Sequence, residues 1–243
     1  MSIGIVGAIE KEVIALKDNM VNVIRSEKGN YIFYSGEIGG MKITLLQSGI
    51  GKVAAAVGTT LLLDNYQVNG VINTGSAGGI GTSVSIGDIV ISTEVCYHDV
   101  GVDSFGYEPG QMADQPARFT ANSELVSYAE RALRRTHSSM PFLKGLICTG
   151  DSFVCTENQK DVIRNSFPNA IAVDMEASAV AQVCYHFNVP FLVLRAVSDV
   201  ADKQSRVSYH RFLNLATENA SRAVLNTLEQ IRSGEDKAAA KSK

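Results

Sequence analysis

The segment 170–183, AIAVDMEASAVAQV, joins a predicted strand to a predicted helix. Its first part, 170–175, is a short β-rich run, and from 176 to 188 the apolar residues follow a helical period. The same alternation of strand and helix recurs along the chain. Strands that alternate with helices indicate an α/β domain with a largely parallel central sheet.

The other predicted elements extend this pattern over most of the chain. Short β-rich runs predict further strands at 3–8, 31–38, 42–49, 70–75, 86–93, 143–150 and 191–199, and helical periodicity predicts helices at 52–66, 122–136 and 211–232. Because no internal repeat or Pro/Gly/Ser-rich linker interrupts them, we expect a single domain over 1–232, with a mixed, largely parallel sheet flanked by helices.

Two segments lie outside the pattern. Residues 99–118 show no periodicity, and a loop of this length in a compact domain is often functional. Residues 233–243 are small and charged, and we expect them to form a disordered C-terminal tail.

The composition excludes several classes of protein. Of the 243 residues, 45% are hydrophobic and 19% are charged, and the net charge is −3. Without a long basic run, the charge argues against a nucleic-acid partner or a membrane surface. No apolar run is long enough to span a bilayer, and the first residues show no signal-peptide pattern, so we expect a cytoplasmic protein.

The cysteines and histidines are dispersed. No two cysteines form a C-x-x-C pair and no histidines have metal-ligand spacing, so we expect free thiols in a reducing compartment, no metal and no other cofactor.

Residues capable of chemistry follow the ends of several predicted strands. In α/β sheets ligands bind outside the carboxyl ends of the strands, so together these residues predict one polar site at one edge of the sheet. They are Glu10 and Glu12, Ser76, Asp151 to Phe153, Asp174 and Glu176, and Ser198 and Asp199.

Each of these residues also has a structural interpretation. Glu12 can favour a helix N-terminus through the helix dipole, and Asp174 fits the N-cap of the helix that follows it. Phe153 can belong to the core or form a platform for a flat ring. Asp199 ends a buried apolar strand, where burial can raise the pKa of its carboxyl, as a general acid requires.

Six motifs in combination resemble the 5′-methylthioadenosine/S-adenosylhomocysteine nucleosidases of the nucleoside phosphorylase superfamily, over roughly residues 2 to 232. The resemblance implies the phosphorylase/hydrolase-type α/β fold and cleavage of an adenine N-glycosidic bond by water. The motifs are GIVGAIEKEV, QSGIGKVAAA, NTGSAGG, GDSFV, VDMEASAVA and RAVSDVAD.

The resemblance also implies roles for particular residues. Asp199 would protonate adenine N7 and Glu12 would activate the attacking water, and these are the two expected catalytic residues. Glu176 would accept hydrogen bonds from the ribose hydroxyls. The other expected substrate-binding residues are Ile9, Ile50, Ser76, Gly78, Phe153, Val154, Met175, Ser198 and Tyr209.

The loop 99–118 gains an explanation from the same resemblance. Val102 and Phe105 would reach the 5′-alkylthio pocket of a second copy, which implies a homodimer that binds a small adenine nucleoside. A role in sulfur salvage and the methyl cycle is implied as well.

Three other functions stay open at this point. Phosphorolysis on the same fold is disfavoured because phosphate sites favour arginine and the chain has none between Arg25 and Arg118, although Lys42 or Lys52 could substitute. A nucleosidase for aminodeoxyfutalosine, with its bulkier 5′ group, is compatible with the motifs. A non-catalytic nucleotide-binding module would need neither Glu12 nor Asp199.

Overall fold

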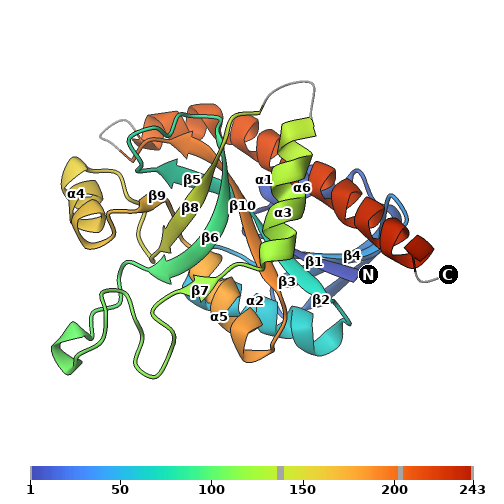
Figure 1. The fold of residues 1–243 in the computed structure, drawn as a ribbon, viewed down its shortest axis with the longest axis horizontal. Helices are drawn as coiled ribbons and strands as arrows, with labels where there is room; N and C mark the ends of the chain where they lie inside the picture. Colours follow the sequence, from blue (N-terminus) through green and yellow to red (C-terminus); the bar gives the residue numbers. More distant parts are fainter. Residues whose placement is uncertain (1, 136–139, 202–204, 242–243) are drawn as a thin grey trace.

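A ten-stranded mixed sheet with helices on both faces forms the centre of the computed structural model, which describes residues 2–135, 140–201 and 205–241 (Figure 1). The strands are β1 (Ser2–Gly7), β2 (Val21–Lys28), β3 (Tyr31–Ile38), β4 (Met41–Gln47), β5 (Gly70–Gly79), β6 (Ile89–Tyr97), β7 (Phe119–Thr120), β8 (Phe142–Thr149), β9 (Ala170–Asp174) and β10 (Phe191–Asp199). The helices are α1 (Glu10–Lys17), α2 (Lys52–Asn65), α3 (Ser123–Arg135), α4 (Glu157–Ser166), α5 (Ala177–His186) and α6 (Ser205–Lys241), with a short 3-10 helix, η1 (Asp103–Phe105).

The sheet closes on itself in its second half. Its strand order is β10-β6-β8-β9-β5-β1-β4-β3-β2, and β10 also pairs with β5. The pairs β1–β4, β1–β5, β10–β5, β6–β8 and β8–β9 are parallel, and the other pairings in the described chain are antiparallel. The predicted single-domain α/β fold with a mixed sheet flanked by helices is therefore confirmed, with parallel pairing concentrated in the central strands.

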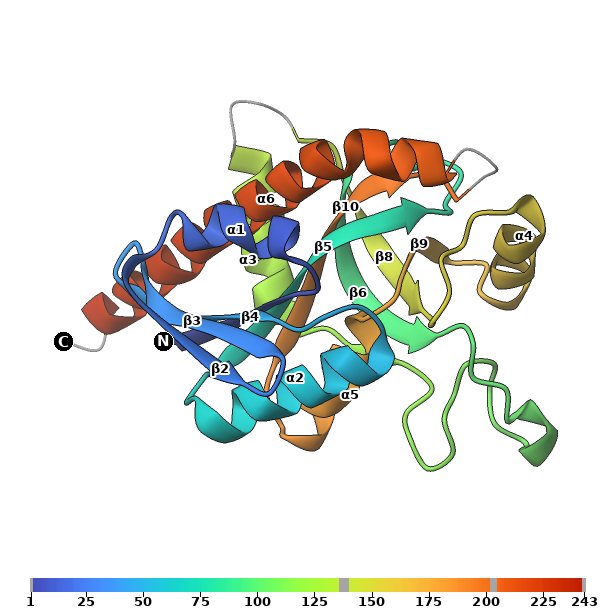
Figure 2. The same ribbon diagram turned by 180° about the vertical axis from the view of Figure 1, so that it is seen from behind.

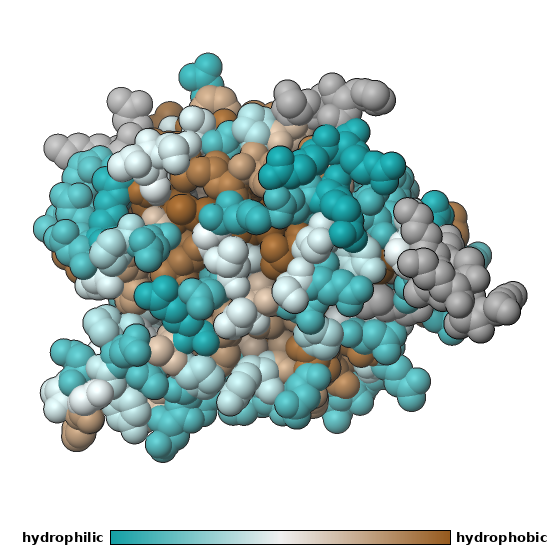
Figure 3. All heavy atoms as spheres, in the orientation of Figure 1, coloured by the Kyte–Doolittle hydropathy of each residue, from teal (hydrophilic) through white to brown (hydrophobic). Residues whose placement is uncertain are grey.

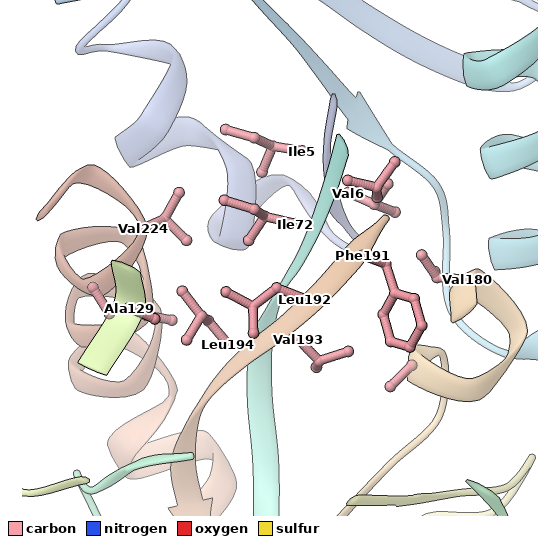
Figure 4. Close-up of a cluster of buried hydrophobic side chains, with 14 of the residues drawn as sticks. Ile5, Val6, Ile72, Ala129, Val180, Phe191, Leu192, Val193, Leu194 and Val224 are labelled. Carbon is pink, nitrogen blue, oxygen red and sulfur yellow. The ribbon is translucent and has the colours of Figure 1, made fainter. Parts of the chain in front are cut away.

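Strand β10 shows why the central runs are apolar throughout. All its residues are buried, and Leu192 and Leu194 point toward α3 and α6 while Phe191 and Val193 point toward α5 (Figure 4). Because successive side chains of a strand point to opposite faces, a strand covered by helices on both faces must be apolar at every position. The polar residues of this strand, Arg195, Ser198 and Asp199, are the exceptions, and all three lie at the candidate site.

Several element boundaries differ from those predicted. The predicted strand at 70–75 continues to Gly79, so the small-residue segment 75–79 is strand rather than loop. The last helix begins at Ser205, before the predicted start at residue 211, and continues to Lys241. Residues 233–241 therefore form its last turns, while the division between domain and tail at 232 stays a prediction. Residue 136, the last of the helix predicted at 122–136, lies outside the described residues.

The loop 99–118 projects away from the sheet in both ribbon views (Figures 1 and 2). It carries η1 at its tip, and Phe105 there is 81% exposed. On the face shown in Figure 3, hydrophilic residues cover most of the rim, and hydrophobic ones show mainly in the central part. Among the helices of the described chain, none is both long enough and apolar enough to cross a membrane.

Candidate active site

A cavity of about 530 Å³ opens at one edge of the sheet, where β5, β9 and β10 end and α6 begins. All the predicted catalytic and substrate-binding residues line it, although they come from distant parts of the chain. They are Ile9, Glu12, Ile50, Ser76, Gly78, Phe153, Val154, Met175, Glu176, Ser198, Asp199 and Tyr209. Of the other residues expected at one polar site, Ser152 also lines the cavity, whereas Glu10 and Asp151 do not.

Glu12 is buried and accepts hydrogen bonds through both of its carboxylate oxygens. Oε2 accepts from the backbone N–H groups of Ala8 at 2.9 Å and Ile9 at 3.3 Å, and Oε1 accepts from the backbone N–H and hydroxyl of Ser76 at 3.0 and 3.1 Å. Glu12 therefore does satisfy donors at the start of α1. It also bridges α1 to β5 and holds its carboxylate in the cavity wall.

Gly75 permits this bridge. Its φ is +145°, and a Cβ at this position would lie 2.6 Å from Oε1 of Glu12 and 2.7 Å from the guanidinium of Arg195. Only a residue without a side chain lets the β5 backbone approach both groups this closely.

Glu176 follows β9 at the start of α5. Its Oε1 accepts from the backbone N–H of Gly51 at 2.9 Å, and its Oε2 lies 3.2 Å from Nη2 of Arg195. Burial raises the pKa of Glu176 to about 7, and the positive charge of Arg195 opposes that rise. The carboxyl is thus poised between its two protonation states near neutral pH.

Arg195 is the main residue of the site that the sequence analysis missed. Its guanidinium is 1% exposed, contacts Asp174 and Glu176, and donates to the Asn73 side chain at 2.9 Å and to the Ser76 carbonyl at 3.1 Å. A lone arginine within the apolar run of 191–197 was the available signal, because a buried charge must be paired.

The prediction that Asp174 is the N-cap of the following helix is wrong in position, because Glu176 is the N-cap residue of α5 and Asp174 ends β9 two residues earlier, although its carboxylate does bond the first N–H groups of the helix. Its Oδ2 accepts from the backbone N–H groups of Glu176 at 3.2 Å and Ala177 at 2.8 Å, at the start of α5. The same carboxylate pairs with Arg195, and Oδ1 accepts from the Thr149 hydroxyl at 2.6 Å. Its structural role is therefore wider than a helix cap.

Asp199 lies at the end of β10 and is 1% exposed. The hydroxyl of Ser198 donates to Oδ1 at 3.2 Å, and the backbone N–H of Ala201 donates to Oδ2 at 3.2 Å. Gly78 lies opposite this carboxyl on the paired strand, and a Cβ there would be in ordinary van der Waals contact with Oδ2, at 3.4 Å. Asp199 is thereby held at the buried end of the cavity.

Phe153 and Tyr209 form an aromatic wall. Their ring centroids are 5.6 Å apart in an edge-to-face arrangement. Phe153 is 37% exposed, so it belongs to the cavity wall rather than to the core, whereas Val154 beside it is buried. Burial raises the pKa of Tyr209, and the charges of Glu12 and Glu176 add to that rise, which keeps its hydroxyl protonated.

The side chains at the mouth of the cavity are more exposed than the buried carboxyl groups in its wall. Ile50 is 58% exposed there, and the exposed side chains of Arg206 and His210, on the first turns of α6, also line the cavity. Neither Val102 nor Phe105 is among the described residues that line it. Within the part of the chain that the structure describes, no group of three or more His, Cys, Asp or Glu side chains is placed to hold a metal ion.

Comparison with known proteins identifies the class. The family model for the phosphorylase superfamily matches residues 2–229. This chain therefore belongs to the phosphorylase superfamily.

Solved structures narrow the relationship to nucleosidases. The 5′-methylthioadenosine/S-adenosylhomocysteine nucleosidase of Neisseria meningitidis, in complex with methylthio-immucillin-A, is 41% identical with a TM-score of 0.92, covering 93% of this chain and 98% of its own. The corresponding enzyme of Colwellia psychrerythraea, in complex with adenine, is 43% identical with a TM-score of 0.92, covering 95% of each chain. The futalosine hydrolase of Helicobacter pylori is 28% identical with a TM-score of 0.90, and the match covers 95% of this chain and 98% of that one.

These neighbours share one chemistry. They are hydrolases of purine nucleosides, and this chain is an N-glycosyl hydrolase of the same kind.

Proposed function

We propose that the protein hydrolyses the adenine N-glycosidic bond of 5′-methylthioadenosine and S-adenosylhomocysteine, and also that of 5′-deoxyadenosine, releasing adenine and the 5-substituted ribose. The observation that carries the proposal is the pair of buried carboxyl groups, Glu12 and Asp199, in the wall of one cavity. Breaking a glycosidic bond builds positive charge on the sugar, and two carboxyl groups in different environments suit that transition state.

Asp199 is proposed as the general acid. It lies at the closed end of the cavity, where a planar base would enter beside Phe153 and Val154. Protonation of adenine N7 by Asp199 would make the base a better leaving group, with Ser198 fixing the carboxyl through its hydrogen bond at 3.2 Å. Phe153 would stack on the ring, and the backbone of Val154 would recognise its edge.

Glu12 is proposed to hold and activate the attacking water. Its Oε1 shares a hydrogen bond with the Ser76 hydroxyl at 3.1 Å, so a water bound between these groups would find an acceptor and a donor together. The buried cation of Arg195 lies on the same wall, where it donates to the Ser76 carbonyl.

The remaining residues are proposed to bind the sugar and its substituent. Glu176 would accept hydrogen bonds from the ribose hydroxyls, a task for which its ionised form is the better acceptor. Met175 would pack on the sugar, and Ile9, Ile50 and Tyr209 would surround the 5′-alkylthio group.

Phosphorolysis is disfavoured by the surroundings of Arg195. This arginine does bring a cation into the cavity, but its charge is already paired with Asp174 and Glu176. A phosphate placed beside it would also meet the carboxyl group of Glu12, which lines the same cavity. Hydrolysis of aminodeoxyfutalosine is the second candidate, supported by the similarity to the H. pylori futalosine hydrolase.

A homodimer is part of the proposal. The loop 99–118 projects from the sheet with Phe105 81% exposed, and Ile50 at the cavity mouth is 58% exposed (Figure 2). Val102 and Phe105 of a second copy would reach the pocket for the 5′-alkylthio group. A cytoplasmic location and a role in methionine salvage stay predictions.

Adenine release from 5′-methylthioadenosine, measured with and without phosphate and with identification of the sugar product, tests the proposal. Free methylthioribose at a rate indifferent to phosphate is the expected result. A strict phosphate requirement with a sugar 1-phosphate product would overturn hydrolysis. Absence of turnover, with activity on aminodeoxyfutalosine instead, would select the second candidate.

A further inference from the structure

One face of the first turns of α6 turns toward the cavity and carries an arginine and a histidine. Arg206, Tyr209 and His210 all line the cavity, and their spacing of three and four residues places them on the same side of the helix. Tyr209 lies between the two others in sequence, with its ring 5.6 Å from those of both Phe153 and His210. Arg206 and His210 are exposed, so they flank Tyr209 at the mouth of the cavity.

The same face of α6 continues toward α1. Asn214, one turn beyond His210, accepts a hydrogen bond from Nζ of Lys11 at 3.4 Å, and Lys11 lies two residues after Ile9. This face of α6 therefore runs beside the part of the cavity wall that is proposed to surround the 5′ substituent. Arg206 takes part in none of the ion pairs formed among the described residues, and its side chain is exposed.

The distribution of charge along the cavity orients the substrate. The carboxyl groups that line it, those of Glu12, Asp174, Glu176 and Asp199, are all less than 9% exposed, whereas other lining residues are exposed: Ile50, Arg206 and His210. The base and the sugar, which take part in the reaction, must reach these groups. The 5′ substituent is then the part of the substrate that extends to the open end, where Ile50, Arg206 and His210 lie.

From this arrangement we infer that Arg206 and His210 form a subsite for a carboxylate at the end of a long 5′ substituent. The inference rests on the proposed function and deepens it: the preferred substrates are adenosine thioethers whose tail ends in an amino acid, such as S-adenosylhomocysteine. Guanidinium and carboxylate groups form strong charge-assisted hydrogen bonds. A methylthio group is too short to reach the mouth and carries no charge, so it gains nothing from this pair.

Steady-state kinetics on three substrates separate charge from length. They are 5′-methylthioadenosine, 5′-butylthioadenosine, whose tail is long but uncharged, and S-adenosylhomocysteine. For Arg206→Gln, the ratio of kcat/KM for S-adenosylhomocysteine to that for butylthioadenosine is expected to fall about five- to tenfold, through KM rather than kcat. His210→Gln should change the ratio in the same direction, and Arg206→Lys should restore part of it.

Arg211→Gln is the matched control, because Arg211 is exposed on the same helix but does not line the cavity. Its ratio should stay at the wild-type value. An equal loss on all three substrates in Arg206→Gln, an unchanged ratio, or an equal change in Arg211→Gln would each overturn the subsite. If the wild-type protein releases adenine from none of the three, the proposed function fails, and the subsite inference fails with it.

Discussion

The guanidinium of Arg195 lies 3.2 Å from a carboxylate oxygen of Glu176, and both side chains are almost entirely buried. The same guanidinium also pairs with Asp174, whose carboxylate accepts from a backbone N–H at the start of α5. One cation therefore compensates the structural carboxylate and the carboxylate proposed to bind ribose. Loss of this cation would leave two buried acids without a compensating charge.

Replacement of Arg195 by Met is expected to destabilise the fold strongly. Removing one partner of a buried ion pair costs about 3–5 kcal/mol, because the remaining charge is left uncompensated. Thermal or urea unfolding at neutral pH measures the change. Arg134→Gln is the control, since Arg134 forms an exposed i,i+4 pair with Glu130 at 2.7 Å, and such pairs contribute less than about 1 kcal/mol. Similar losses in both variants would contradict the compensating role of Arg195.

The raised pKa of Glu176 predicts a pH dependence of substrate binding. Burial raises this pKa from 4.5 to about 7, and the ionised carboxylate is the form that accepts from two ribose hydroxyls. The kcat/KM for 5′-methylthioadenosine should therefore rise as the pH passes upward through about 7. In Glu176→Gln, kcat/KM should be lower and should no longer rise with pH in this range. If the rise near pH 7 persists in the variant, another titrating group causes it.

The same group gives the opposite sign for stability. Because its folded-state pKa lies above the usual 4.5, the native protein retains a proton that the unfolded chain releases between about pH 4.5 and 7. The contribution of Glu176 to stability should therefore fall as the pH rises through this window. The difference in unfolding free energy between wild type and Glu176→Gln, measured at pH 5 and pH 8, isolates it. A difference that does not change with pH would exclude a raised pKa.

Gly75→Ala should disrupt the site through the approach of β5 to Glu12. A Cβ there would meet both Glu12 and Arg195 at less than 3 Å, and displacement of a catalytic group by about 1 Å can cost roughly 10²-fold in rate. Gly29→Ala serves as control, because Gly29 also has a positive φ, of +59°, but has no atom within 4 Å of the added Cβ. Adenine release should fall only in Gly75→Ala. Equal activity in the two variants would show that the close approach is not required.

The sequence predicted those parts of the fold in which pattern and environment agree. Strand β10 matches its predicted range because helices cover both of its faces, and such a strand is apolar throughout. The helix α4 was missed because eight of its ten residues are polar and it covers only a small secondary core. Strand β2 was missed because nearly all of its side chains are exposed, which removes the alternation that marks a half-buried strand.

The site was predictable where polar residues lie at the end of a strand or within a few residues after it. Glu12, Glu176 and Asp199 come from such positions, and the family resemblance supplied their proposed roles. Arg195 was missed because a charge inside an apolar run was treated as part of the strand. Arg206 and His210 could not be found in this way, because their place at the mouth depends on where α6 crosses the sheet edge.

Asp199→Asn tests the general acid. An amide cannot deliver a proton to N7 but occupies nearly the same volume, so the loss should be roughly 10²-fold or more in kcat with little change in substrate binding. Adenine release and the dissociation constant of a non-hydrolysable analogue measure the two effects. A non-catalytic binding module would lose neither. A loss of binding that matches the loss of rate would make Asp199 a binding residue only.

Glu12→Gln is expected to be nearly inactive while still binding substrate. The amide keeps the size of the side chain and can still accept from Ala8 and Ile9, but it is a far weaker base toward water. Glu10→Gln is the matched control, because Glu10 lies in the same first turn of α1, is exposed, and does not line the cavity. If the carboxylate at 12 served only the helix N-terminus, the two variants would behave alike, since both remove one negative charge from that turn. Turnover retained in Glu12→Gln would remove the water-activating role, whereas a loss confined to Glu12→Gln, with the unfolding temperatures of the two variants equal, would establish that its carboxylate acts on the reaction.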